Sequence, residues 1–412
     1  MSTQKNEPRA LALGVSCYVI WGFFPLYFSR LAPAGAVEVI VHRAVWGLVF
    51  CLAALAVTGS LGKVRALIAD RGALWRLAVA GALVVVNWSV YVYAVLAGHT
   101  TDAAIGYFIN PLVTIALGLI VLRERITEVM AYDGIVGADP DDVVVTTGSQ
   151  QALDLVTELF VNPGDVILAE APSYVGALGV FRARQADVVH VPMDENGIIP
   201  EALVETIRDV RASGRTIKFI YIIPNYHNPA GVTLSAERRP IIAEICLREH
   251  VLIVEDNPYG LLGFHNDPLP AIASYSPEGV VYLGSFSKMF APGFRIGLAY
   301  APHAIRAKLV LALESAILCP SMVGQMAIAD YLSNYDWYGQ VKSFRSMYAE
   351  RCRAMLTSLE EYMPSCSWTV PDGGFYTWVT LPEGLDAKAM LPRAVRAQVA
   401  YVSGTAFFYD GQ

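Results

Sequence analysis

Hydrophobic positions follow two different patterns along the chain, and the pattern changes near residue 127. Before that point, four long runs contain no charged residue, at residues 10–29, 44–62, 77–98 and 103–122. Each run has about 20 residues, the length that a helix needs to cross the hydrocarbon core of a membrane. A signal peptide would account for one run but not for four in succession. The pattern therefore predicts a membrane segment of four transmembrane helices.

Basic residues around these runs predict the orientation of the helices. They gather before the first run, between the second and the third, and after the fourth: Lys5, Arg9, Lys63, Arg65, Arg71, Arg76, Arg123 and Arg125. The loops on the other side contain few basic residues: Arg30, and Arg43 at the start of the second run. Because basic loops stay on the cytoplasmic side, we expect a multi-pass protein of the cytoplasmic (inner) membrane. The rest of the chain then lies in the cytoplasm.

After residue 127, short apolar runs alternate with amphipathic stretches. Turn-forming residues fill 128–142, which is no fifth membrane helix. Strands are expected at 143–146, 166–170, 188–192, 219–224, 252–255 and 280–284, and helices at 150–160, 200–212, 236–249 and 302–315. This alternation predicts an α/β domain with a mostly parallel sheet covered by helices on both faces, and ligands beyond the carboxyl ends of the strands. The expected domains are residues 1–127 and 128–412.

Composition and charge narrow the choice of partners. The chain has 412 residues, of which 55% are hydrophobic and 16% charged, and the apolar excess belongs to the first 127 residues. The net charge of −7 gives no reason to expect a nucleic-acid partner, whereas the apolar runs imply a lipid bilayer. The six cysteines lie far apart, without metal-ligand spacing, so we expect free thiols and no metal site.

The richest chemistry lies in residues 285–297. Lys288 follows Ser285 and Ser287 and precedes Arg295, with an apolar run before them and Pro-Gly between the lysine and the arginine. A lysine can form a Schiff base with an aldehyde, while hydroxyl and guanidinium groups hold a phosphate. The alternative is an ordinary lysine on a solvated loop. The segment resembles the pyridoxal-phosphate lysine segment of class I/II aminotransferases.

Two further segments follow predicted strands and suit the same cofactor. Gly148 and Ser149 open a helix, where free N–H groups favour a phosphate and Ser149 can cap the helix. Asp256 ends a strand, and a carboxylate there can keep a pyridine nitrogen protonated. Strand alternation sends the competing Glu255 to the opposite face. The simpler interpretations are a plain helix cap for Ser149 and a turn cap for Asp256.

Three other residues can contact the cofactor ring. Tyr259, three residues after Asp256, can hydrogen-bond the ring's phenolic oxygen, and Asn228 can donate its amide to the same atom. Tyr174 can stack on the ring, although a core tyrosine would explain it as well. His227 is interpreted as a wall residue rather than an acid or base, because Lys288 already fills that role.

Taken together, residues 129–412 resemble fold-type I aminotransferases, most closely the branch of 2-aminoadipate aminotransferases and MocR regulators. The likeness includes residues 371–375 in what would be the small domain. The resemblance implies a pyridoxal 5'-phosphate enzyme that transfers an amino group between an amino acid and a 2-oxo acid, with a homodimer as a possible assembly. It implies catalytic roles for Lys288, Asp256 and Tyr259. The implied cofactor-binding residues are Ser149, Gln150, Tyr174, Asn228, Asp256, Tyr259, Ser285, Ser287, Lys288 and Arg295.

Residues 9–126 resemble a different family, the RarD-type permeases of the EamA drug/metabolite transporter superfamily. The likeness rests on residues 21–27, 38–43, 87–88, 98–99, 106–112 and 122–125. Such permeases have ten helices in two repeats, so four helices are less than one repeat and cannot form a complete path.

Both halves are shorter than members of their families, the second one at both of its ends. The aminotransferase-like part lacks an N-terminal portion and has a shortened small domain, and neither Arg393 nor Arg396 occupies the position of the arginine that binds the substrate α-carboxylate. The expected function is transamination by a domain tethered to the cytoplasmic face of a membrane. Two alternatives stay open: a permease fragment with an accessory domain, and a non-functional fusion of two gene fragments.

Overall fold

The chain folds into two compact units, divided between Thr114 and Ile115. The computed structural model describes residues 30–31, 34–59, 71–99, 101, 122–265 and 267–411.

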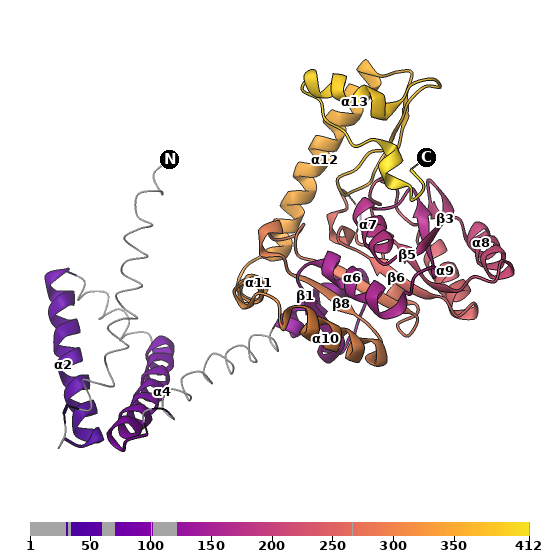
Figure 1. The fold of residues 1–412 in the computed structure, drawn as a ribbon. Coiled ribbons are helices and arrows are strands. Elements are labelled where there is room, and N and C mark those ends of the chain that lie inside the picture. Colours follow the sequence, from indigo (N-terminus) through magenta and orange to yellow (C-terminus); the bar gives the residue numbers. More distant parts are fainter. Residues whose placement is uncertain are drawn as a thin grey trace. The chain divides into compact units, whose positions relative to one another are not determined.

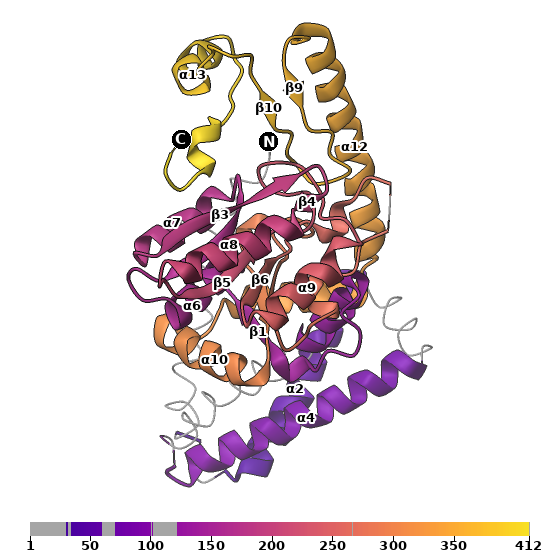
Figure 2. The ribbon, with the colours of Figure 1, turned by 90° about the vertical axis from the view of Figure 1, so that its right-hand side faces the viewer.

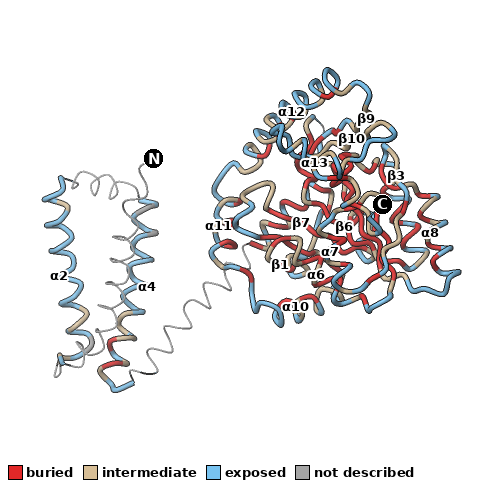
Figure 3. The backbone as a smooth tube through the Cα atoms, turned by 45° about the horizontal axis from the view of Figure 1, so that its top comes forward, coloured by how far each residue is buried: buried red, intermediate tan, exposed pale blue. Residues whose placement is uncertain are grey.

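The described part of the first unit is a pair of long apolar helices, α2 (Ala36–Val57) and α4 (Arg71–Leu96). Both are long and apolar enough to cross a membrane, over Val37–Val57 and Leu77–Leu96. They contact each other near Val92 and Val95, while most of their other side chains are exposed (Figure 3). Apolar side chains on all sides of a helix are typical of a lipid-facing segment.

These two helices correspond to the predicted runs 44–62 and 77–98. The first run, 10–29, lies outside the described residues, and so does the fourth, 103–122, except for Leu122. Helix α2 begins at Ala36, before the predicted start, and thereby includes Arg43, whose guanidinium carbon lies 3.5 Å from the centroid of the Trp88 ring. A cation on an aromatic face is a favourable contact for a charged group in an apolar helix.

The second unit is built on one eight-stranded sheet. Its strands are β1 (Val143–Thr146), β2 (Val166–Ala171), β3 (Asp187–Asp194), β4 (Gly197–Ile198), β5 (Ile217–Ile222), β6 (Leu252–Asp256), β7 (Val280–Ser285) and β8 (Gly297–Tyr300). Their order is β1-β8-β7-β6-β5-β2-β3-β4. Pairing is parallel among β3, β2, β5, β6 and β7, whereas β8 pairs antiparallel with both β7 and β1, and β4 pairs antiparallel with β3. All six predicted strands are present, and the mostly parallel α/β architecture is confirmed.

Helices cover both faces of this sheet (Figure 1). They are α6 (Ser149–Phe160), α7 (Val175–Ala183), α8 (Pro200–Ala212), α9 (Arg238–Arg248) and α10 (His303–Ile317). One layer contains α6, which packs on β1, β7 and β8 and contacts α7 and α10. The other contains α8 and α9, which pack on β3, β5 and β6. With both faces covered, the central strands are buried, as parallel sheets require.

A smaller C-terminal part follows the sheet (Figure 2). It contains α11 (Met322–Asn334), α12 (Trp337–Tyr362), the antiparallel pair β9 (Ser367–Trp368) and β10 (Val379–Thr380), α13 (Ala387–Arg396) and the 3₁₀ turn η6 (Gly404–Phe407). Backbone bonds tie its residue 371–376 loop to the sheet part, because Phe264 N–H donates to the Asp372 carbonyl (2.7 Å) and Gly374 N–H to the Leu262 carbonyl (3.2 Å).

Residues 122–130 form a helix that crosses the predicted domain boundary at 127. Its buried residues Leu122, Ile126, Val129 and Met130 belong to the hydrophobic core of the second unit. Their spacing is that of one helix face. The residues that resemble the permease string at 122–125 therefore lie in the α/β unit, and the division between units falls before them, at 114/115.

Candidate active site

A pocket with about 620 Å³ of empty space, open to solvent, lies beyond the carboxyl ends of β5, β6 and β7. The residues predicted from the sequence to bind the cofactor all line it, together with three that were not predicted: Ile223, Pro258 and Tyr376. The ten predicted residues come from five separate segments, and the topology of the sheet brings these segments together.

One end of the pocket is suited to an anion. Gly148 precedes α6 with a φ of +78°, and a Cβ there would stand 2.6 Å from Arg295 Nη2, so the guanidinium lies directly against the helix start. Arg295 Nη1 donates to Ser287 Oγ (3.4 Å), and Ser287 N–H donates to Ser285 Oγ (3.2 Å). Free helix N–H groups beside a guanidinium and two hydroxyls form a phosphate site.

The expected cap at this helix is absent. Gly148, not Ser149, is the N-cap residue, and no side chain caps the helix. Ser149 is the first helical residue instead, because the glycine adopts the left-handed backbone that a close approach to Arg295 requires. The prediction that Ser149 caps α6 was therefore wrong, and its side chain lines the pocket.

Gln150 and Tyr174 form one wall. Gln150 Nε2 donates to the Gly176 carbonyl (3.1 Å), which links α6 to the start of α7. The Tyr174 ring lies so close to Gly176 that a Cβ there would collide with it. Burial raises the pKa of the Tyr174 hydroxyl, and the Asp256 carboxylate raises it further. Tyr174 thus presents a neutral aromatic face to the pocket.

The carboxylate of Asp256 lies deep in the pocket. Its Oδ2 accepts a hydrogen bond from the Tyr221 hydroxyl (2.7 Å), while its Oδ1 is buried without a partner. Burial raises the pKa of Asp256 to about 6, and the bond from Tyr221 opposes the rise. A buried acceptor without a donor is costly, so Oδ1 is prepared for a donor from a ligand. Tyr221 was not predicted, although a tyrosine in a buried strand needs a hydroxyl partner.

Glu255 points to the other face of the sheet, as strand alternation predicted. Its two carboxylate oxygens accept from the N–H groups of Ile272 (2.9 Å) and Ala273 (2.8 Å). Burial raises its pKa to about 7. It does not line the pocket.

Tyr259 and Asn228 lie together near Asp256. The Tyr259 hydroxyl is buried, lies 3.3 Å from the Tyr376 hydroxyl and is hydrogen-bonded by the Asn228 side chain. Burial raises the pKa of Tyr259 far above its ordinary value. Tyr376 was not singled out in the sequence, although it directly follows the family string at 371–375.

Lys288 is half-buried and faces an aromatic wall. Its Nζ lies 5.7 Å from the centroid of the Phe375 ring. Phe375 in turn contacts Tyr348 and Tyr259 edge to face, with centroids 4.6 and 5.6 Å apart. The lysine amine therefore projects toward a site that combines an apolar wall with hydroxyl groups.

His227 is held away from the pocket. Its Nε2 lies 3.1 Å from Glu170 Oε2, and its Nδ1 accepts from the Ala230 N–H (3.3 Å), which puts a proton on Nε2. Both side chains of this pair are buried. The histidine fixes the loop that carries Asn228 and does not line the pocket, so its interpretation as a wall residue was wrong.

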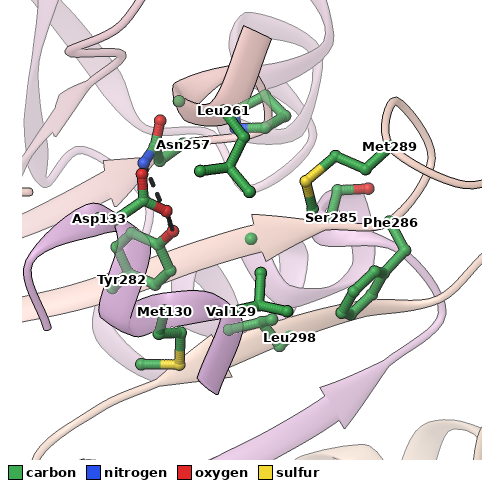
Figure 4. A pocket seen from close by; sticks show the side chains of 13 residues that line it. Val129, Met130, Asp133, Asn257, Leu261, Tyr282, Ser285, Phe286, Met289 and Leu298 are labelled. Carbon is green, nitrogen blue, oxygen red and sulfur yellow. Dashed lines mark hydrogen bonds between the residues drawn. The ribbon is translucent and has the colours of Figure 1, made fainter. Parts of the chain in front are cut away.

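A second, smaller cavity lies behind the site (Figure 4). The Tyr282 hydroxyl donates to Asp133 Oδ2 (2.8 Å), beside Asn257. Burial raises the pKa of Asp133 to about 6, and bonds from Tyr282 and Asn257 oppose the rise. Asn225 and the buried Arg239 extend this polar group, since Asn225 bonds both Asn257 (2.8 Å) and Arg239 (2.7 Å). The network fixes the residue that follows Asp256.

Other candidate chemistry is remote from the pocket. Arg393 and Arg396 are exposed on α13 and do not line it. Within the described ranges, no three histidine, cysteine or acidic residues are grouped so that they could hold a metal ion.

Comparisons with known proteins agree on one family. Residues 85–409 match the family model described as aminotransferase class I and II. The aromatic-amino-acid aminotransferase 1 of Thermococcus litoralis is 42% identical over 294 residues, which cover 71% of this chain and 70% of that protein. The 2-aminoadipate transaminase of Thermus thermophilus is 37% identical and covers 67% of this chain and 69% of that protein. A crystal structure of Pyrococcus horikoshii kynurenine aminotransferase has a TM-score of 0.67 at 39% identity, covering 71% and 72% of the two chains.

Proposed function

The chain belongs to the class I and II aminotransferase family, whose members use pyridoxal phosphate, and we therefore propose that it is a transaminase. In this proposal Lys288 and its neighbours move an amino group from an amino acid to a 2-oxo acid. The observation that carries the proposal is the convergence on one pocket of the ten residues that the family resemblance implied from the sequence. This membership agrees with the family resemblance found in residues 129–412.

The chemistry of the pocket fits the cofactor at both ends. Asp256 Oδ1, buried and without a partner, would accept the N–H of a pyridine ring. The open start of α6, Ser287 and Arg295 would hold the phosphate. Tyr174 would lie against the ring, while Asn228 and Tyr259 would bind its phenolic oxygen.

Each residue then has one task. When bound, pyridoxal phosphate supplies an electron sink for the electrons that remain on the substrate α-carbon after proton loss. Lys288 would hold the cofactor through its amine, and the freed Nζ would move the proton of the substrate α-carbon. Asp256 holds the proton on the ring nitrogen, because its buried carboxylate is strongly stabilised by that partner. The phosphate contacts fix the ring so that Nζ and the α-carbon stay within reach.

Lys288→Ala tests the assignment, with Lys342→Ala as the control. Lys342 is a lysine of α12 whose Nζ lies 4.9 Å from the Tyr338 ring, outside the pocket. We expect the unaltered protein and Lys342→Ala to bind pyridoxal phosphate with a visible absorbance band, and borohydride to fix the cofactor on the Lys288 peptide. Lys288→Ala should lose both signals. A cofactor fixed on another lysine, or a Lys288→Ala protein that still exchanges amino groups, would refute the assignment.

We further propose that the amino donor carries a large, planar side chain. Support comes from the Phe375 ring beside the Lys288 amine, from the Tyr259 ring that packs edge to face on Phe375, and from the name of the Thermococcus relative. Aromatic rings gain stability from edge-to-face contacts beyond their area burial. Single-turnover rates with phenylalanine, tyrosine, alanine and aspartate test this. Equal rates with alanine and phenylalanine would count against it.

We also propose that the first unit anchors the enzyme in the cytoplasmic membrane, with the pocket on the cytoplasmic side. Support comes from α2 and α4, whose exposed side chains include Trp46, Phe50 and Leu83. Exposed apolar surface of this extent is costly in water. After alkaline carbonate extraction the full chain should stay in the membrane pellet, and protease should reach the second unit only when the cytoplasmic face is open. Release into the supernatant would refute the anchor.

A further inference from the structure

Tyr376 brings a hydroxyl into the pocket from the C-terminal part of the chain. Its oxygen lies 3.3 Å from the Tyr259 oxygen, and the two rings meet edge to face with centroids 5.9 Å apart. Tyr259 is buried, whereas Tyr376 is partly exposed and lines the same pocket as Lys288. The two hydroxyls come from positions 117 residues apart in the sequence.

The backbone holds Tyr376 firmly in this place. Gly231, with a φ of +71°, lies so close to the Tyr376 carbonyl oxygen that a Cβ would collide with it. Gly373 forms a β-bridge with Gly263, four residues after Tyr259, and Trp378 N–H donates to Thr369 Oγ1 (2.9 Å). The loop that carries Tyr376 is therefore fixed to both the Asn228 loop and the Tyr259 loop. The contact between the hydroxyls is a property of the fold, not of a free side chain.

One hydroxyl can donate only one hydrogen bond, so the partners of Tyr259 decide where its proton points. The Asn228 amide and the Tyr376 hydroxyl are both able to donate to the Tyr259 oxygen. With both as donors, the Tyr259 proton is left for a third group, in the pocket.

We propose that Tyr376 is a positioning residue: its hydroxyl donates to Tyr259 and thereby directs the Tyr259 proton at the phenolic oxygen of the cofactor. The inference rests on the proposed function, because it needs the cofactor ring beside Tyr259. Tyr376 acts through Tyr259 and touches no reacting atom in this role.

The donor chain has a measurable electrostatic consequence. Hydrogen bonds in a chain polarise one another, so a donor behind Tyr259 makes Tyr259 a stronger donor. Donation to the phenolic oxygen draws negative charge away from the neighbouring Lys288 Nζ. Without the Tyr376 hydroxyl, more negative charge stays beside Nζ and holds its proton more firmly. The pH at which the visible band of the bound cofactor changes should therefore rise.

The test is a pH titration of that band in the full-length holoenzyme. Tyr376→Phe removes only the hydroxyl, and we expect the midpoint to rise by roughly 0.3–0.7 pH unit. Tyr348→Phe is the control, since Tyr348 packs on Phe375 in the same aromatic cluster but does not line the pocket. Its midpoint should equal that of the unaltered protein.

A second pair of proteins tests whether Tyr376 acts through Tyr259. In a Tyr259→Phe background, adding Tyr376→Phe should leave the midpoint where Tyr259→Phe alone has set it. An additional rise would overturn the positioning role, and so would an unchanged midpoint in Tyr376→Phe with a normal visible band. Absence of the band in the unaltered protein would instead overturn the proposed function, and this inference with it.

Discussion

The substitution Asp256→Asn should make the cofactor-free protein more stable while it removes catalysis. The Asp256 carboxylate is 5% exposed, and one of its oxygens has no partner. Asparagine has the same shape and can still accept the bond from Tyr221, but it carries no charge to bury. A site that is strained without its ligand is a common cost of function.

The expected gain in unfolding free energy follows from the pKa of Asp256, which burial raises from 3.8 to about 6. The folded protein thus binds this proton more tightly than the unfolded chain, so stability is lost as pH rises from about 4 to about 6. Two pKa units correspond to about 3 kcal/mol. At pH 8 the variant should therefore exceed the unaltered protein by about 3 kcal/mol in unfolding free energy, and at pH 5 by about half as much.

Cys246 supplies the assay. It is a buried thiol of α9, and burial raises its pKa to about 12, so it reacts only when the α/β unit opens. Cofactor-free protein in mild detergent is equilibrated in urea, pulsed with a thiol reagent, and labelling of the Cys246 peptide is measured by mass spectrometry at pH 5 and pH 8. Asp187→Asn, at an exposed carboxylate, is the control and should change little. Equal gains at both pH values, or a loss of stability at pH 8, would refute the reasoning.

Two other substitutions test the anion site and the buried network. Gly148→Ala and Gly164→Ala both place a Cβ at positive φ, but only the Cβ at position 148 meets Arg295. Each substitution should therefore lower the unfolding free energy by about 1 kcal/mol. Only Gly148→Ala should also weaken cofactor binding in equilibrium titrations, by roughly tenfold or more. Equal affinities would rule out the contact. Arg239→Leu leaves several carbonyl groups and the Glu255 carboxylate without their buried cation, so urea unfolding should show a loss of about 3–5 kcal/mol. A loss below about 1 kcal/mol would show that the buried charge is dispensable.

Most of the sheet could be predicted, because its strands are short apolar runs bounded by turn-forming residues. Strand β8 could not be, since Gly-Leu-Ala-Tyr has no β-branched residue and owes its structure to pairing with β1 on one side and β7 on the other. Helix α2 was predicted to start too late because a charged residue was taken as its limit. Arg43 instead lies within α2, where its guanidinium packs on the ring of Trp88 from α4.

The candidate site was predictable where its residues directly follow strands. Parallel strands deliver their carboxyl ends to one edge, so motifs after β5, β6 and β7 had to meet there. Tyr221 and Tyr376 escaped prediction because their roles depend on distances across 35 and 117 residues of chain. A local sequence pattern does not indicate which residues that far apart in the chain will be in contact.

Burial of the apolar side chains in the helix at residues 122–130 depends on the number of residues in that segment as much as on their types. Successive residues of a helix are about 100° apart around the axis. Adding or removing one residue between Ile126 and Val129 would turn Leu122 and Ile126 out of the core in which they are now buried. Their apolar side chains would then face water, and the salt bridge from Arg123 to Asp141 would lose its direction. This helix of the α/β unit can therefore vary in residue type more freely than in residue number.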